Sequence, residues 1–243
     1  MDVDRFLDEL HNHGVSLARS AEYTSMDTPV PTCPAWTVSR LLGHLTKVHR
    51  WSSHVVRTGS PDGFEFQRPA PDQLITYFLS GLDDLVMAIR EAPEDRPIWT
   101  LWPVRSPRLY WARRQAHEVA IHRVDIELAV GYGVSEFEPD FAADGIDELL
   151  MGLLPIGTTA AESHSLVVEP LDRNVSWTVQ VGAAGLETRR EASPQADLSL
   201  FGLSSDLYRW VWNRATDDEV SLRGDVLVAD WWRRTALVGA RAD

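Results

Sequence analysis

The chain has 243 residues, of which 44% are hydrophobic, enough to bury a sizeable core and to form two domains. Its 36 acidic and 23 basic residues give a formal net charge of −13. This balance argues against nucleic acid or an anionic membrane as the main partner, because phosphate binding needs a basic face. No apolar run approaches the roughly 18 residues of a membrane span. Since the acidic first residues are also unlike a signal peptide, we expect a cytoplasmic protein.

Hydrophobic periodicity predicts four long helices in the first part of the chain, because apolar residues recur there at intervals of three and four positions. Irregular segments that contain proline separate these helices. The segment at 58–71 exceeds the usual length of a helix connection, which suggests a rim or lid. We expect the four amphipathic helices to pack as an up-down bundle. Their predicted ranges are 3–23, 38–56, 72–91 and 108–131.

The pattern changes after Gly131, where β-branched residues and partial alternation predict strands between shorter helices. The expected fold class is therefore mixed, α plus α/β, with a four-helix bundle followed by a smaller α+β domain. We place the two domains at 1–155 and 156–243. The predicted helices are 141–154, 204–213 and 225–238, and the predicted strands lie within 163–170, 174–182, 186–192, 196–202 and 219–224.

Two residues of the fourth helix suggest a metal site. Glu118 and His122 are four positions apart, so they lie one above the other on the same helix face. A carboxylate and an imidazole in this arrangement are two ligands for a divalent metal. The third candidate is His44, which lies within the apolar stripe of the second helix and should face the bundle interior. Three ligands leave an open coordination position, which is typical of a catalytic zinc; nickel and iron accept the same ligands.

Each feature also has a simpler interpretation. Glu118 and His122 alone could be an ordinary polar pair on a solvated face, and His44 alone a core histidine. Together they favour a metal site, because a buried histidine and a buried glutamate each need a partner. His117 is five positions from His122, about 140° round the helix, so these two cannot clasp one ion as the histidines of a zinc protease do. The same spacing separates His44 from His49.

Three other side chains near the site have open roles. Asp125 and Arg123 either support the ligands from outside or form a surface salt bridge. Cys33 is the single cysteine, which excludes an internal disulfide. No histidine is placed by sequence to activate Cys33, so we interpret it as a passive thiol.

Two segments carry a family resemblance: VPTCPAWTVSRLLGHL at 30–45, which contains the turn from Pro34 to Trp36, and HEVAIHRVDIELAVG at 117–131. They resemble the mycothiol-dependent maleylpyruvate isomerase family, whose N-terminal domain is a DinB-like four-helix bundle. ADLSLFGLSSDLYRWVWNR at 196–214 and SLRGD at 221–225 look like the sterol-carrier-like C-terminal domain of that family. The resemblance covers nearly the whole chain.

The resemblance implies a divalent metal, usually zinc, held by His44, Glu118 and His122. It also implies mycothiol, the low-molecular-weight thiol of actinobacteria, as cosubstrate, and a small electrophile as substrate. The metal would keep the thiol ionised, so that the protein is an isomerase or an S-transferase. The family motif makes Arg214 the candidate catalytic or substrate-binding arginine, with Arg209 and Arg223 as alternatives.

The resemblance also allows other readings of the whole protein. We expect a monomer or a homodimer, with Trp36 packed behind the metal site. The alternative function is a non-catalytic protein that binds a metal or an apolar ligand and keeps the family fold. Its motivation is the tryptophan-rich second half of the chain, with Trp210, Trp212, Trp231 and Trp232.

Overall fold

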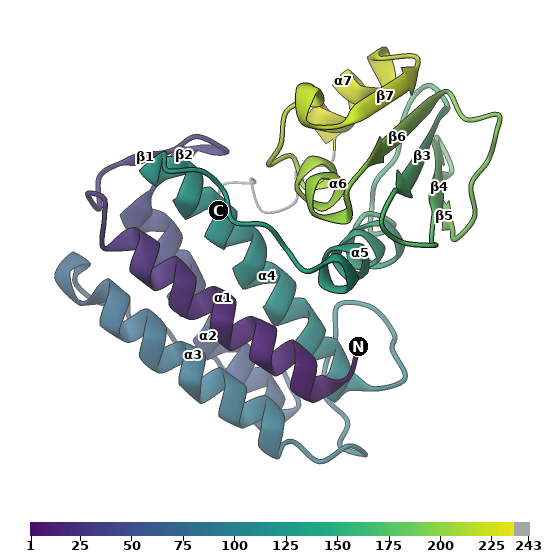
Figure 1. Cartoon of the computed structure of the whole chain (residues 1–243). Helices are drawn as coiled ribbons and strands as arrows, with labels where there is room; N and C mark the ends of the chain where they lie inside the picture. Colours follow the sequence, from purple (N-terminus) through teal and green to yellow (C-terminus); the bar gives the residue numbers. More distant parts are fainter. Residues whose placement is uncertain (236–243) are drawn as a thin grey trace. The chain divides into compact units, whose positions relative to one another are not determined.

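The computed structural model describes residues 1–235 and divides the chain into two compact units (Figure 1). The first unit is Met1–Ser135, and the second begins at Glu136. This division comes earlier than the one expected near residue 155. The reason is that the helix after Ser135 buries its apolar side in the second unit, where Phe137 and Phe141 both contact the ring of Tyr208. The mixed α and β fold class predicted from the sequence is confirmed.

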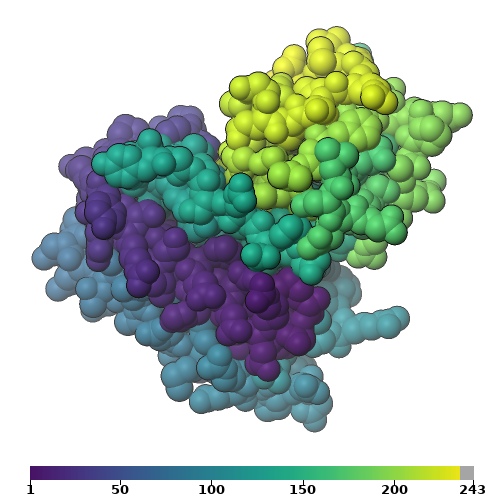
Figure 2. All heavy atoms as spheres, viewed as in Figure 1, coloured from purple at the N-terminus to yellow at the C-terminus, as the bar shows by residue number. Residues whose placement is uncertain are grey.

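Four long helices make up most of the first unit. They are α1 (Val3–Ala21), α2 (Val38–Thr58), α3 (Leu74–Glu91) and α4 (Pro107–Val130), with a short 3₁₀ turn at Pro71–Gln73. The side chains of Asp2, Thr37 and Ser106 accept hydrogen bonds from the first-turn N–H groups of α1, α2 and α4. Gly59 and Gly131 end α2 and α4 in the left-handed conformation that glycine adopts at little cost. On the face drawn in Figure 2, side chains cover the backbone of these helices.

Helices α2 and α3 run in the same direction. His49 packs on Phe78 with the ring centroids 4.9 Å apart, and further along both helices Arg57 forms an ion pair with Asp84 at 2.6 Å. The parallel orientation of α2 and α3 departs from the alternating up-down order expected from the sequence. Helix α4 runs opposite to α2, since His44 near the start of α2 meets the middle of α4 and Trp51 further along α2 meets the start of α4.

The length of the segment between α2 and α3 follows from this arrangement. A connection between two parallel neighbours must travel back along the whole of the first helix. Arg68 in this segment donates hydrogen bonds to the backbone carbonyl and hydroxyl of Ser39, in the first turn of α2. The segment predicted to be a rim or lid is therefore a crossover that lies along α2.

A short antiparallel ribbon precedes α2, in a segment expected to be irregular. It consists of β1 (Pro29–Val30) and β2 (Cys33–Thr37). The ribbon is joined to the start of α2 by a hydrogen bond from the N–H of Val38 to the carbonyl of Thr28. It carries Thr32 and Trp36 toward α4 and α2, so it positions two side chains of the site described below.

The second unit contains a five-stranded mixed sheet and helices. Hydrophobic side chains on one sheet face, among them Leu166, Val179 and Leu198, are buried. The strand order is β5-β4-β3-β6-β7, in which only the β3–β6 pair is parallel (Figure 1). The elements are α5 (Pro139–Glu148) with a π-helical turn at Leu149–Leu153, β3 (His164–Pro170), β4 (Trp177–Gly182), β5 (Gly185–Arg189), β6 (Leu198–Gly202), α6 (Ser204–Val211), a 3₁₀ turn at Asp217–Glu219, β7 (Ser221–Gly224) and α7 (Leu227–Thr235).

Each strand predicted for this unit is present. The last helix begins as expected, because the carboxylate of Asp225 accepts a hydrogen bond from the N–H of Leu227. The predicted continuation of that helix to residue 238 lies outside the described residues. Among the helices of residues 1–235, none combines the length and apolar composition needed to cross a bilayer.

Candidate metal centre

The structure brings the three predicted ligands together between α2 and α4. Nε2 of His44 lies 3.3 Å from Oε1 of Glu118, and Nε2 of His122 lies 3.5 Å from the same oxygen. One potential ligand atom from each of these residues falls within 4.8 Å of the other two. His122 is buried, whereas His44 and Glu118 are about one quarter exposed. Within residues 1–235, no other group of three histidine, cysteine, aspartate or glutamate side chains lies close enough together to share a metal ion.

The distances from the two imidazole nitrogens to Oε1 of Glu118 are also those expected between the ligand atoms of a metal site. Ligand atoms about 2.1 Å from a tetrahedral zinc ion lie about 3.4 Å from one another. The two distances to Oε1 of Glu118, 3.3 and 3.5 Å, match this value. A hydrogen bond between an imidazolium and a carboxylate is shorter, at about 2.7–2.9 Å. The donor set of two imidazole nitrogens and one carboxylate oxygen is also one that zinc prefers.

The ring of His122 is oriented by a buried carboxylate. Its Nδ1 lies 2.7 Å from Oδ2 of Asp125, so Nε2 is the nitrogen that faces Glu118. The hydroxyl of Thr32, from the ribbon before α2, donates to the other oxygen of Asp125. Burial alone would lower the pKa of His122, but the hydrogen bonds with Asp125 and Glu118 raise it to about 9. The sequence left the roles of Asp125 and Arg123 open, and the structure shows that Asp125 is the one that contacts a candidate ligand.

Glu118 is oriented from its other side by an arginine. Nη2 of Arg114, one turn earlier on α4, donates to Oε2 of Glu118 at 3.0 Å. Burial would raise the pKa of Glu118. Hydrogen bonds with His122 and His44 and the charge of Arg114 outweigh burial and hold that pKa well below its usual value. Glu118 is thus a carboxylate at neutral pH, as a metal ligand must be.

Trp36 forms one wall of the site. Its ring stacks on His122 with centroids 6.1 Å apart and an interplanar angle of 19°, and its centroid is 4.9 Å from that of His44. The guanidinium of Arg40 lies over the same indole ring, 5.7 Å from its centroid. Trp36 is buried, as expected for a side chain packed behind the ligands. Cys33 is also buried, which agrees with a passive thiol rather than a nucleophile.

The remaining histidines of these helices face elsewhere. His117 is fully buried and contacts the ring of Phe6 on α1, at a centroid distance of 6.0 Å. His49 packs on Phe78 of α3, and Nε2 of His54 lies 2.8 Å from a backbone carbonyl in the following segment. The exclusion of His117 as a partner of His122 therefore agrees with the structure.

The buried ring of His49 gives a testable pH dependence. Burial lowers its pKa to about 4, against 6.5 in an unfolded chain. The unfolded state therefore binds the proton first as the pH falls below about 6.5, so stability is lost between about pH 6.5 and 4. We expect this residue to cost on the order of 2 kcal/mol of unfolding free energy by about pH 4.5.

Urea denaturation of His49→Leu and of the parent protein at about pH 7.5 and 4.5 measures this loss. The variant should lose less stability on acidification than the parent does. His11→Leu, at a histidine that is about half exposed, is the control. An equal loss in the parent and in His49→Leu would show that His49 does not bind a proton on unfolding.

The candidate arginines lie in the second unit, and the structure gives each of them local contacts. Arg214 is buried and donates to the carbonyl of Trp212 at 2.7 Å. Arg209 pairs with two carboxylates, at 2.6 and 2.8 Å. Arg223 is exposed, with its guanidinium 5.4 Å from the ring centroid of Phe201. The catalytic role of Arg214 stays a prediction.

The tryptophans of the second unit serve mainly as core residues. Trp210, Trp212 and Trp232 are buried, and their indole N–H groups donate to Asp217 and to the carbonyls of Gly145 and Val211, respectively. These contacts satisfy the polar edge of each ring inside the fold. The tryptophan content therefore gives little support to an apolar-ligand site.

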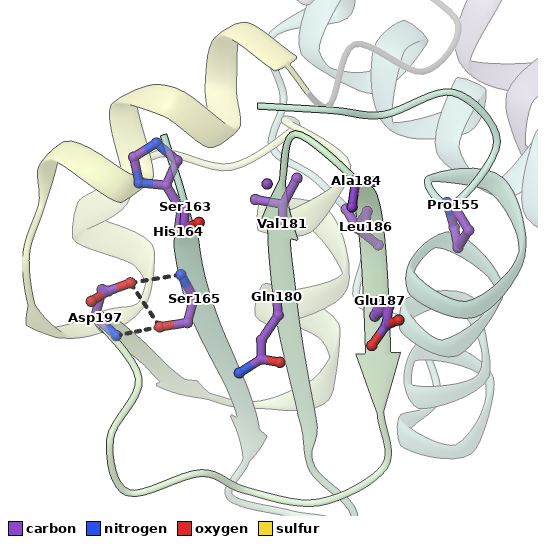
Figure 3. Close-up of a pocket in the computed structure, with 12 residues that line it drawn as sticks. Pro155, Ser163, His164, Ser165, Gln180, Val181, Ala184, Leu186, Glu187 and Asp197 are labelled. Atoms are coloured by element: carbon purple, nitrogen blue, oxygen red, sulfur yellow. Dashed lines mark hydrogen bonds between the residues drawn. The ribbon is translucent and has the colours of Figure 1, made fainter. Parts of the chain in front are cut away.

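A depression of about 660 Å³ lies on the second unit, along β3, β4 and β5 (Figure 3). Its lining mixes polar side chains, among them His164, Gln180 and Glu187, with apolar ones. Ser165 and Asp197 hold its rim together, because the hydroxyl and N–H of Ser165 each donate to Asp197 at 2.7 Å. The depression contains none of the predicted site residues.

Sequence reasoning missed two residues of the candidate centre. Arg114 is four positions before Glu118, and the same spacing rule that paired Glu118 with His122 would have found it. Thr32 is 93 positions from Asp125, and its sequence neighbourhood carries no sign of the contact. Arg123, considered as a supporting group, instead pairs with Glu127 and donates to the carbonyl of Ser135.

Comparisons with known proteins bear on the family and the fold of the chain. Residues 7–127 match the model of the mycothiol maleylpyruvate isomerase N-terminal domain. A crystal structure of the mycothiol-dependent maleylpyruvate isomerase has a TM-score of 0.66 at 16% identity, and one of its histidine-to-alanine mutants has 0.67 at 15%. Both cover 93% of this chain and 95% of their own, and at these identities they show the fold. No curated protein sequence matches the chain. Through its N-terminal domain, the chain belongs to the mycothiol-dependent maleylpyruvate isomerase family.

Proposed function

We propose that this protein is a metal-dependent enzyme that uses mycothiol, or a similar low-molecular-weight thiol, to act on a small electrophile. The observation that carries the proposal is the convergence of His44, Glu118 and His122, in which both imidazole nitrogens lie 3.3–3.5 Å from Oε1 of Glu118. Zinc is the metal that we propose, and nickel or iron would accept the same ligands. When bound, such a cation lowers the pKa of a coordinated thiol and keeps it ionised at neutral pH.

The residues around the ligands have definite tasks in this proposal. Asp125 holds His122 in the tautomer whose Nε2 is available as a ligand. Trp36 covers one side of both imidazoles and keeps water from that side. His44 and Glu118 are partly exposed, which leaves a side from which small molecules reach the site. Arg214 remains the arginine that we propose for an anionic substrate, on the strength of the family motif.

The ionised thiol supports two reactions, which have different outcomes for the thiol. If it adds to an activated double bond, permits rotation about the resulting single bond and departs, the substrate is isomerised and the thiol is regenerated. If it displaces a leaving group, the sulfur stays on the product and the thiol is consumed. The family match supports isomerisation, and S-transfer is the alternative that the same site would allow.

The test is thiol-dependent turnover of metal-depleted and zinc-reloaded protein with two substrates. One is a cis enedioate related to maleylpyruvate, followed by its absorbance, and the other is an alkyl halide, followed by thiol loss. We expect turnover that needs both zinc and thiol, and that His44→Ala abolishes. His54→Ala, at a histidine on the same helix that faces away from the site, is the matched control. Zinc-loaded protein that turns over neither substrate would favour the non-catalytic alternative.

A further inference from the structure

The carboxylate of Glu118 is shared between two kinds of partner. Its Oε1 faces Nε2 of His44 and of His122, at 3.3 and 3.5 Å. Its Oε2 accepts a hydrogen bond from Nη2 of Arg114 at 3.0 Å. The arginine side chain is 6% exposed and lies one helical turn before Glu118 on α4. The two oxygens therefore point in different directions, one toward the histidines and one toward a buried cation.

A buried guanidinium is unfavourable unless a partner of opposite charge compensates for its desolvation. Removing an arginine from water is strongly unfavourable, and a well-oriented carboxylate offsets this cost. A site that only needed to bind a dication would gain nothing electrostatically from a second cation one turn away. The ion pair between Arg114 and Glu118 is thus better explained by the orientation that it gives to the carboxylate than by attraction of a metal ion.

We propose that Arg114 is a positioning residue that restricts Glu118 to ligation through Oε1 alone, and that this keeps one coordination position open for the thiol. The inference rests on the proposed function of the site. An unrestrained carboxylate can offer both oxygens to one metal ion. With Oε2 engaged by Arg114, only Oε1 is available, and the ligand count stays at three.

The test uses cobalt(II) in place of zinc, because its visible absorption distinguishes four-coordinate from five-coordinate sites. In Arg114→Met we expect Oε2 to join the metal, with weaker visible bands than the parent protein shows. Because Oε2 then competes with the thiol, the KM for mycothiol should rise roughly 10-fold, at the lower end of effects from groups behind metal ligands. Arg114→Lys, which keeps a cation near Oε2, should return the spectrum toward that of the parent.

A matched control lies on the same helix. Arg123 and Glu127 form a second buried pair at the same spacing, 3.6 Å apart, away from the ligands. Arg123→Met should lower stability without changing the cobalt spectrum. If Arg114→Met does not fold, Arg114→Gln replaces it with the same expected change, since it removes the charge and keeps a polar side chain.

The outcomes separate this inference from the function on which it rests. An Arg114→Met protein with the spectrum and the mycothiol KM of the parent would overturn the positioning role and leave the proposed function intact. Parent protein that binds cobalt no better than His44→Ala would instead overturn the proposed function itself.

Discussion

Alanine at His44, Glu118 or His122 is expected to lower zinc affinity by more than about 100-fold. Even groups that only support a metal ligand typically contribute about 10- to 100-fold, and in the proposed site each of these three supplies a ligand atom itself. The loss should be large at each of the three positions, because the two imidazole nitrogens lie at similar distances, 3.3 and 3.5 Å, from Oε1 of Glu118. Competition with a chromophoric chelator measures the affinity, and thiol-dependent turnover should fall in parallel.

Glu118→Gln sharpens this prediction. It keeps the volume of the side chain and removes its charge, so a loss of affinity in this variant points to ligation and not to packing. His54→Ala, on the face of α2 away from the site, should retain the affinity of the parent. An alanine variant at any of the three ligands that binds zinc as tightly as the parent would remove that residue from the site.

The second large effect is expected at Asp125. This carboxylate is fully buried and 2.7 Å from Nδ1 of His122. Asp125→Ala should lower the unfolding free energy of the metal-free protein by roughly 3 kcal/mol, the low end for a broken buried ion pair, because the imidazole can lose its proton. It should also weaken zinc binding by about 10- to 100-fold, since the orientation of His122 is lost.

The pH dependence of this effect has a definite sign. The pKa of His122 is raised to about 9, above its value in an unfolded chain, so the stabilisation is fully present below about pH 6.5 and is lost as the pH rises through about 9. Denaturation of Asp125→Ala and of the parent at about pH 6 and pH 10 should therefore show a larger difference at the lower pH. A difference of the same size at both values would show that Asp125 does not stabilise a protonated His122.

The candidate ligands could be named from the sequence because helical geometry decides which side chains share a face. Any two residues four positions apart on a helix share a face, as Glu118 and His122 do. His44 lies within an apolar stripe that must turn inward. The same rule places Arg114 next to Glu118, although it does not tell which polar neighbours of a ligand matter. The contact between Thr32 and Asp125 depends on how the ribbon before α2 folds back, and local pattern does not encode that.

The fold was predictable in its elements and less so in their arrangement. Periodicity located the helices because it reports which face is buried, but it is unchanged when a helix reverses direction, so the parallel pair of α2 and α3 was missed. The long segment after Thr58 was the available clue. Similarly, the apolar residues of α5, such as Phe141, show that this helix packs against a core without showing which of the two cores it joins.

X-ray absorption at the zinc edge of the reloaded protein, before thiol is added, tests the central claim most directly. The account predicts one zinc per chain, bound by two imidazole nitrogens at about 2.0–2.1 Å and carboxylate oxygen at about 2.0–2.2 Å, without sulfur. Mycothiol should then add one sulfur at about 2.3 Å. Zinc that binds below one equivalent, that shows a single imidazole, or that already carries sulfur before thiol is added would contradict the account.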